Sequence, residues 1–189
     1  MRAQPAGLPT GFLYRPGFVP PDEEAALLPS IESLPFHQVR MKVVSRRTVV
    51  HFGWDDQPAP PIPIFLLHVR EMCAFAAGLP PEELAQVLVS RYPEGAGIGW
   101  HREAPMFGPV VAGISLGAAC RMRFRRPLTE GYETSAVLLE ARSMYLLRGE
   151  ALSDWQQSIP ALKSVRYSVT FRQVRRTWLE RHGHAPPSP

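Results

Sequence analysis

Three short segments of this sequence carry the residues whose types and spacing could do chemistry. His101 and Glu103 stand two positions apart, Gln157 comes much later in the chain, and Arg166 and Arg172 share one segment near its end. This order is typical of a non-haem iron oxygenase, in which two imidazoles and one carboxylate bind one face of the metal and leave positions open for substrate and oxygen. The two arginines could bind a dicarboxylate co-substrate through bidentate ion pairs.

Two of these positions depart from the usual donor set. Glu103 keeps a carboxylate but is longer than aspartate, which moves its oxygen by about 1.5 Å unless another rotamer compensates. Gln157 offers a neutral amide oxygen where an imidazole nitrogen suits iron better. Gln156 cannot take its place, because adjacent residues in an extended segment point to opposite faces. We therefore expect iron(II) binding to be weak or absent.

Four segments contain motifs that are weak singly and specific together. They are RRTVVHFG (46–53), YPEGAGIGWH (92–101), ISLG (114–117) and RYSVTFR (166–172). In this order and at these separations they resemble the AlkB family of iron(II)- and 2-oxoglutarate-dependent dioxygenases, which oxidatively remove alkyl groups from nucleic-acid bases. The resemblance covers nearly the whole chain, from residue 11 to residue 175.

The resemblance implies a role for each site residue. The positions of the iron(II) ligands are those of His101, Glu103 and Gln157. The positions that bind 2-oxoglutarate are those of Ser90, Tyr92, Arg166, Ser168 and Arg172. Arg166 would pair with the distal carboxylate, helped by the Tyr92 hydroxyl. Arg172 would lie near the metal-side carboxylate and also touch the acidic ligand. Ser90 and Ser168 stand where many members have asparagine, so the shorter side chains would hold the co-substrate less tightly.

Two functions follow from these residues. The first is an Fe(II)- and 2-oxoglutarate-dependent dioxygenase that acts as an oxidative dealkylase, or demethylase, on alkylated nucleic-acid bases. The alternative is a non-catalytic or metal-impaired AlkB-like protein that keeps the fold together with a diacid-binding or nucleic-acid-binding role. The residues alone do not choose between them, or between DNA and RNA.

Basic and aromatic side chains cluster in two regions that could contact nucleic acid. In the first, the resemblance places a substrate lid, with contacts from Arg46, Arg47, Phe52 and Trp54. Arginines there could meet phosphates while an aromatic ring stacks on a flipped-out base. Packing against the core is the alternative for the two aromatic side chains. The second region is the basic run Arg121, Arg123, Arg125 and Arg126, whose first three members share a strand face.

The composition is that of an ordinary globular protein. The chain has 189 residues, 45% of them apolar and 20% charged, which is enough for one domain with a substantial core. Its net charge of +4 is compatible with a polyanionic partner and equally with a basic protein that has none. Cys73 and Cys120 form no paired motif. No apolar run is long enough to span a bilayer, so we expect a cytoplasmic protein. We also expect a monomer.

The order of expected elements predicts a mainly β (α+β) fold. We expect a strand and turn over 12–18, helices over 21–34 and 64–77, a hairpin over 40–52, a proline-rich loop over 57–63 and a helical turn over 81–85. Short strands are expected over 86–92, 110–116, 119–125, 135–139, 143–147 and 164–174. This pattern favours a sandwich or barrel, and the resemblance implies a double-stranded β-helix, or jelly roll, backed by N-terminal helices. The expected division is a tail over 1–10, one domain over 11–178 and a tail over 179–189.

Overall fold

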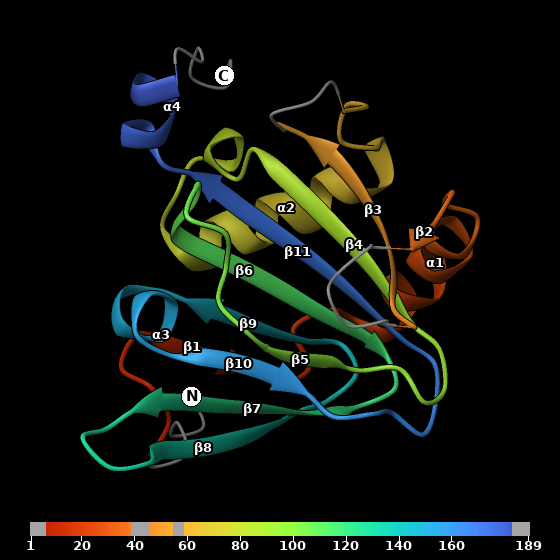
Figure 1. The fold of residues 1–189 in the computed structure, drawn as a ribbon. Coiled ribbons are helices and arrows are strands. Elements are labelled where there is room, and N and C mark those ends of the chain that lie inside the picture. Colours follow the sequence, from red (N-terminus) through yellow and green to blue (C-terminus); the bar gives the residue numbers. More distant parts are fainter. Residues whose placement is uncertain (1–6, 39–45, 55–58, 183–189) are drawn as a thin grey trace.

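The computed structural model describes residues 7–38, 46–54 and 59–182, whose strands form two antiparallel sheets (Figure 1). The larger sheet has the strand order β1 (Phe12–Arg15), β9 (Ser143–Leu147), β6 (Phe107–Gly117), β11 (Arg166–Val174), β4 (Gln86–Tyr92), β3 (Thr48–Gly53) and β2 (His37–Gln38). The smaller sheet has the order β5 (Ile98–His101), β10 (Gln156–Ile159), β7 (Cys120–Pro127) and β8 (Tyr132–Leu139).

The helices lie outside the two sheets. They are α1 (Pro21–Glu32), α2 (Ile64–Ala77), the 3-10 turn η1 (Pro81–Glu83), α3 (Gly149–Ser153) and α4 (Arg176–His182). The helix α2 ends at Gly78, whose φ of 66° is the left-handed conformation that glycine adopts without strain. Leu66, Val69 and Cys73 lie at helical spacing and form its buried face. The N-terminal helices α1 and α2 back the larger sheet in the way the sequence predicts.

Two apolar cores hold these layers together. The first lies between α1, α2 and the larger sheet and includes Leu27, Leu66 and Ile114. The second lies between the two sheets and includes Val111, Phe124 and Leu139. Figure 1 shows α2 on one face of the larger sheet and the smaller sheet on its other side. The predicted mainly β fold, a jelly roll backed by N-terminal helices, is confirmed.

The central strand β11 is buried on both faces, and its two faces differ in chemistry. Tyr167, Val169 and Phe171 belong to the core beneath the helices. Because side chains alternate along a strand, the intervening residues face the smaller sheet, and these are Arg166, Ser168, Thr170 and Arg172, all buried. Buried polar groups are costly unless they have partners. A polar row on a central strand therefore marks the place where the fold binds something.

Most expected elements are present, with some differences at their ends. The strand expected over 110–116 runs from Phe107 to Gly117, and that over 164–174 begins at Arg166. Of the hairpin expected over 40–52, β3 is present, and it pairs with β2, which lies before the expected range. Residues 39–45 lie outside the described residues, as do 57 and 58 of the proline-rich loop. The sequence did not predict β5, β10, α3 or α4. The helix α4 continues past residue 178, and its Leu179 is buried.

Within the described residues, no helix is both long enough and apolar enough to cross a membrane.

Candidate active site

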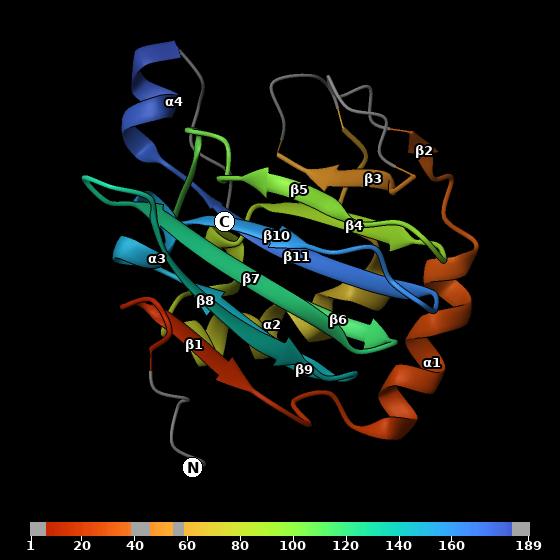
Figure 2. The ribbon, with the colours of Figure 1, turned by 60° about the horizontal axis from the view of Figure 1, so that its bottom comes forward.

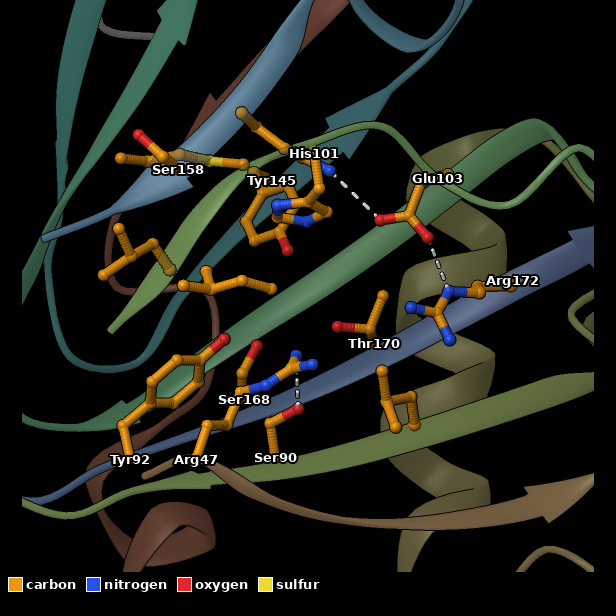
Figure 3. Close-up of a pocket in the computed structure, with 15 residues that line it drawn as sticks. Arg47, Ser90, Tyr92, His101, Glu103, Tyr145, Ser158, Ser168, Thr170 and Arg172 are labelled. Atoms are coloured by element: carbon orange, nitrogen blue, oxygen red, sulfur yellow. Dashed lines mark hydrogen bonds and ion pairs between the residues drawn. The ribbon is translucent and has the colours of Figure 1, made fainter. Parts of the chain in front are cut away.

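The polar row of β11 forms the floor of a pocket between the two sheets (Figure 3). Ser168 pairs in register with Ser90 on β4 and with Ser115 on β6, so three small polar side chains lie side by side across the larger sheet. The pocket has a volume of about 420 Å³, open space at its mouth included. Small side chains on the floor thus leave room for a ligand.

The smaller sheet brings the predicted metal ligands to this pocket. His101 is the last residue of β5 and pairs with Gln157 on β10, and Glu103 follows β5 in the chain. All three line the pocket, together with Arg172 from the floor. Residues far apart in the sequence therefore meet as the resemblance implies.

The side chains of Glu103, Gln157 and Arg172 form a polar network, which we call the carboxylate bridge. The Nε2 of Gln157 donates to Oε1 of Glu103 at 3.0 Å. The Nε of Arg172 donates to Oε2 of the same carboxylate at 2.9 Å, and both side chains are about 10% exposed or less (Figure 3). The Nη1 of Arg172 also donates to Gln86 at 3.0 Å. Each oxygen of the Glu103 carboxylate therefore already accepts a hydrogen bond from the protein.

His101 lies beside the carboxylate bridge as a neutral imidazole. Its Nδ1 is 2.9 Å from the carbonyl oxygen of Gly99, which requires a proton on Nδ1 and leaves the lone pair on Nε2. Burial lowers the pKa of His101 below its ordinary value, and the arginines Arg47 and Arg172 lower it further, against the opposing effects of Gly99 and Glu103. One ring nitrogen is therefore able to accept a proton or coordinate a metal.

The opposite end of the pocket is cationic. Arg47, just before β3, is buried, and its Nη1 donates a long hydrogen bond of 3.5 Å to Oγ of Ser90. Arg166 lies behind the lining, 1% exposed, and its Nε donates to Ser115 at 2.9 Å. The Tyr92 ring lies between them, 5.9 Å from the guanidinium carbon of Arg47 and 5.2 Å from that of Arg166. The Nη1 of Arg166 is buried and has no hydrogen-bond partner among the described residues.

Two further pocket residues were missed by the sequence analysis. Tyr145 on β9 and Thr170 on β11 both line the cavity. Burial raises the pKa of Tyr145 to about 12, so its hydroxyl stays protonated and can donate. Its ring lies over Gly113, where an added Cβ would be 2.1 Å from the ring. The glycine is the signal that could have identified this tyrosine, since a strand glycine often marks a close approach.

The four residues of the predicted substrate lid lie in four different environments. Phe52 packs in the core beneath the helices, so its prediction as a base-stacking residue is wrong. Arg47 lies inside the pocket, whereas the prediction placed it in the lid. Trp54 packs against a small cluster that includes Ala85 and Leu179, and Arg46 is exposed. Only Arg46 has the exposure expected of a phosphate contact.

Comparison with known proteins agrees with this geometry. Residues 48–172, about two thirds of the chain, match the family model of the 2OG-Fe(II) oxygenase superfamily. The chain belongs to this superfamily. Among solved structures, OsALKBH1 matches with a TM-score of 0.70 at 17% identity, covering 88% of this chain and 99% of that one. A Pseudomonas putida prolyl-4-hydroxylase matches with a TM-score of 0.63 at 15% identity, covering 87% and 93%. At these identities the two structures support the fold alone.

The similar curated proteins are AlkB-like. The Xenopus tropicalis tRNA (carboxymethyluridine(34)-5-O)-methyltransferase alkbh8 is 27% identical over 82% of this chain and 26% of its own length. The Arabidopsis thaliana alkylated DNA repair protein ALKBH8 homolog is 27% identical over 87% of this chain and 58% of its own length. The chain thus spans about a quarter and three fifths of these relatives. The predicted AlkB-like membership is confirmed.

The superfamily implies 2-oxoglutarate and iron(II), and the residues fit only the first. A carboxylate suits the end of the pocket that holds Arg47, Arg166 and the Tyr92 hydroxyl. A buried guanidinium nitrogen of Arg166 has no hydrogen-bond partner there among the described residues. At the metal positions, both oxygens of Glu103 are engaged, and Gln157 turns its amide nitrogen, which cannot coordinate a metal, toward them. Within the described residues, no three His, Cys, Asp or Glu side chains are grouped to hold a metal ion. The donor set does not fit iron.

Proposed function

We propose that this protein binds a five-carbon dicarboxylate such as 2-oxoglutarate without a metal ion and is a poor iron(II) oxygenase. The carboxylate bridge carries this proposal, because Gln157, which stands at a metal-ligand position, donates its amide N–H to the acid that should coordinate iron. This N–H occupies Oε1 in the role that a cation would otherwise have. Metal binding through Oε1 would have to displace the bond from Gln157, whereas the bond from Arg172 to Oε2 could remain.

The charge of the pocket supports a dianionic ligand. Three buried arginines surround it, Arg47, Arg166 and Arg172, against the single carboxylate of Glu103. His101 adds no charge at neutral pH, because its pKa is lowered. Arg166 keeps a buried guanidinium nitrogen without a hydrogen-bond partner among the described residues, where an unsatisfied donor is costly. A carboxylate of a diacid would accept a hydrogen bond from this nitrogen.

The side chains around the pocket also suit the shape of such a ligand. Arg47, Arg166 and Tyr92 would bind the distal carboxylate. The hydroxyls of Ser168, Thr170 and Tyr145 would donate to the other end. Arg47 takes up space beside Ser90, where the shorter side chain leaves room. Arg47 thereby compensates for the weaker binding of the co-substrate that serine at positions 90 and 168 would give.

Calorimetric titration in the presence of a chelator tests this proposal. We expect 2-oxoglutarate and glutarate to bind with similar affinity, because neither ligand needs a metal. We expect 2-oxovalerate, which has the same carbon number but one carboxylate, to bind at least tenfold more weakly. Charge-assisted hydrogen bonds of about 1.5–3 kcal/mol justify that ratio. Absence of diacid binding under these conditions would refute the proposal.

The second candidate function is oxidative dealkylation of an alkylated nucleic-acid base. Two observations favour it, the lone pair on Nε2 of His101 and the Oε1 of Gln157, which is buried without a hydrogen-bond partner among the described residues. The names of the relatives point the same way, since they include a probable RNA/DNA demethylase, ALKBH6 of Danio rerio, 27% identical over 74% of this chain. Release of succinate and formaldehyde from methylated oligonucleotides, with iron(II) and 2-oxoglutarate supplied, would establish this function over the first.

A further inference from the structure

The outer face of the smaller sheet carries arginine and aromatic side chains in direct contact. Along β7, Cys120, Met122 and Phe124 point inward and are buried. Because the strand alternates, the residues between them point outward, and these are Arg121, Arg123 and Arg125. Figure 2 views the molecule with the smaller sheet in front of the larger one, so that β7 and β8 lie toward the reader. The dicarboxylate pocket, lined by Met122, lies behind this strand.

Two of the three outward arginines are stacked on aromatic rings. The guanidinium carbons of Arg123 and Arg125 lie 5.1 and 4.5 Å from the ring centroid of Trp100 on β5. Arg125 also lies 4.5 Å from the ring of Tyr132, the first residue of β8, which is 53% exposed. These are cation–π distances. We call this set of five residues, Trp100, Arg121, Arg123, Arg125 and Tyr132, the arginine–aromatic face.

Hydrogen bonds fix the planes of two of these guanidinium groups. The Nε of Arg123 donates to Oγ of Ser158 at 3.1 Å. The Nε of Arg125 donates to Oε1 of Gln156 at 2.7 Å. Both bonds use Nε, so the terminal nitrogens of each guanidinium, which carry four more N–H donors, point to other positions. The arginines are therefore ordered before any partner binds.

The cross-strand neighbours of the three arginines on β8 include no acidic side chain. The cross-strand partners of Arg121, Arg123 and Arg125 on β8 are Leu138, Ala136 and Thr134. Among the described residues, none of these three arginines forms an ion pair, whereas Arg126 pairs with both Glu133 and Glu150. The face thus presents three positive charges with no carboxylate to balance them.

We propose that the arginine–aromatic face binds single-stranded nucleic acid. Alternate residues on a strand are about 7 Å apart, so the three arginines form a line of charge that can contact successive phosphates. Tyr132 and the ordered guanidinium planes offer flat surfaces on which bases stack. An acidic peptide or an anionic membrane would use the charge but not the planes. This surface is independent of the dicarboxylate site, because β7 separates the two.

Fluorescence anisotropy of a labelled single-stranded oligonucleotide of mixed sequence, measured across a salt series, tests this assignment. We expect the triple variant Arg121→Gln, Arg123→Gln, Arg125→Gln to bind at least 100-fold more weakly. The slope of log affinity against log salt should fall by about 2, since each phosphate contact on a single strand contributes about 0.7. We expect Tyr132→Ala to lose about tenfold and Tyr132→Phe to bind normally.

The matched control removes the same charge elsewhere on the surface. Arg15, Arg176 and Arg181 are exposed and lie outside the face, so their triple change to glutamine should leave most of the affinity. Equal losses in the two triple variants would overturn the assignment, since the binding would then follow net charge alone. Equal affinity for polyglutamate or for phosphatidylserine vesicles would overturn it as well.

A single variant that is expected to stay folded is the control for unfolding of the triple variant. Arg121 is exposed and, unlike Arg123 and Arg125, is not stacked on an aromatic ring among the described residues, so Arg121→Glu should keep the melting temperature of the unaltered protein. We expect it to weaken oligonucleotide binding about tenfold and to lower the salt slope. An unchanged slope in this folded variant would contradict the proposal.

Discussion

The two ends of the pocket differ in how their polar groups are satisfied. At the cationic end, Arg166 keeps a buried nitrogen without a partner, and Tyr92 lies between two arginines. At the end with the carboxylate bridge, Glu103 is fully engaged by its neighbours. The group left unpaired at the first end is a donor suited to an anion, whereas those left unpaired at the second end are acceptors, Oε1 of Gln157 and Nε2 of His101. Unsatisfied buried groups thus indicate where a ligand is still expected, even within one pocket of a recognised superfamily.

Restoring the usual metal ligands should remove this difference between the two ends of the pocket. Of the changes considered, it should have the largest effect on turnover. In the double variant Gln157→His, Glu103→Asp, an imidazole replaces the amide and the acid has the usual length, so the three usual metal ligands are present. We expect succinate release from 2-oxoglutarate to rise at least 100-fold at matched iron(II). Partial recovery is compatible with this expectation, because surrounding hydrogen bonds tune such sites. If the unaltered chain already turns over as fast as the double variant, Gln157 is a working ligand.

Removing the acid of the carboxylate bridge should lower the stability of the folded protein. Glu103→Ala leaves the buried Arg172 without its carboxylate, and breaking a buried pair from one side costs about 3 kcal/mol or more. We expect the free energy of unfolding in urea to fall by that amount. The double variant Glu103→Ala, Arg172→Met should recover part of the loss, because no charge then remains unpaired. A single variant as stable as the unaltered protein would show that the bridge contributes little.

Changing Arg47 tests the cationic end. We expect Arg47→Met to bind 2-oxoglutarate about 10- to 100-fold more weakly, in line with the loss of one charge-assisted contact, while its affinity for 2-oxovalerate changes little. The matched control is Arg46→Met, which removes the same charge from the exposed neighbouring position. Calorimetry in a chelator measures both variants. Equal affinities in the two would place Arg47 outside the binding site and leave the dicarboxylate proposal to stand on Arg166.

The smallest effect concerns the protonation of His101. Its pKa is lowered in the folded protein, chiefly by burial, so the unfolded chain binds more protons below the ordinary value of 6.5. Stability therefore falls as the pH drops below that value. We expect His101→Gln, measured in a chelator by urea unfolding at pH 8 and pH 5, to lose less stability on acidification than the unaltered protein. A larger loss in the variant would show that the sign is wrong.

The sequence predicted the fold and the meeting of His101, Glu103 and Gln157, because the strands alternate clearly and the motifs resemble a known family. It failed at Phe52 and Arg47 for a reason that alternation could have revealed. The two are five positions apart, so they point to opposite faces of β3, and only one of them can face the pocket. Phe52 faces the helices with Val50, and Arg47 faces the pocket.

Other parts of the site depend on contacts that no local pattern contains. The strands β5 and β10 are four residues each and mix glycine or glutamine with apolar residues, so they lack an alternating signal. Tyr145 reaches the pocket because β9 pairs with β6 opposite Gly113, a register fixed by the whole sheet. The carboxylate bridge also depends on side-chain geometry, since the amide of Gln157 could turn either its oxygen or its nitrogen toward Glu103.

The carboxylate bridge has a mechanical consequence. Gln157 belongs to the smaller sheet, Arg172 belongs to the larger one, and Glu103 joins them from the segment after β5. The network is therefore a strut between the two layers, and it sets their separation at one end of the sandwich. Because the two hydrogen bonds are in series, parting the sheets there requires at least one of them to break in a buried setting. The width of the cavity is thus fixed in advance, and a ligand arriving at the other end meets walls that need no rearrangement.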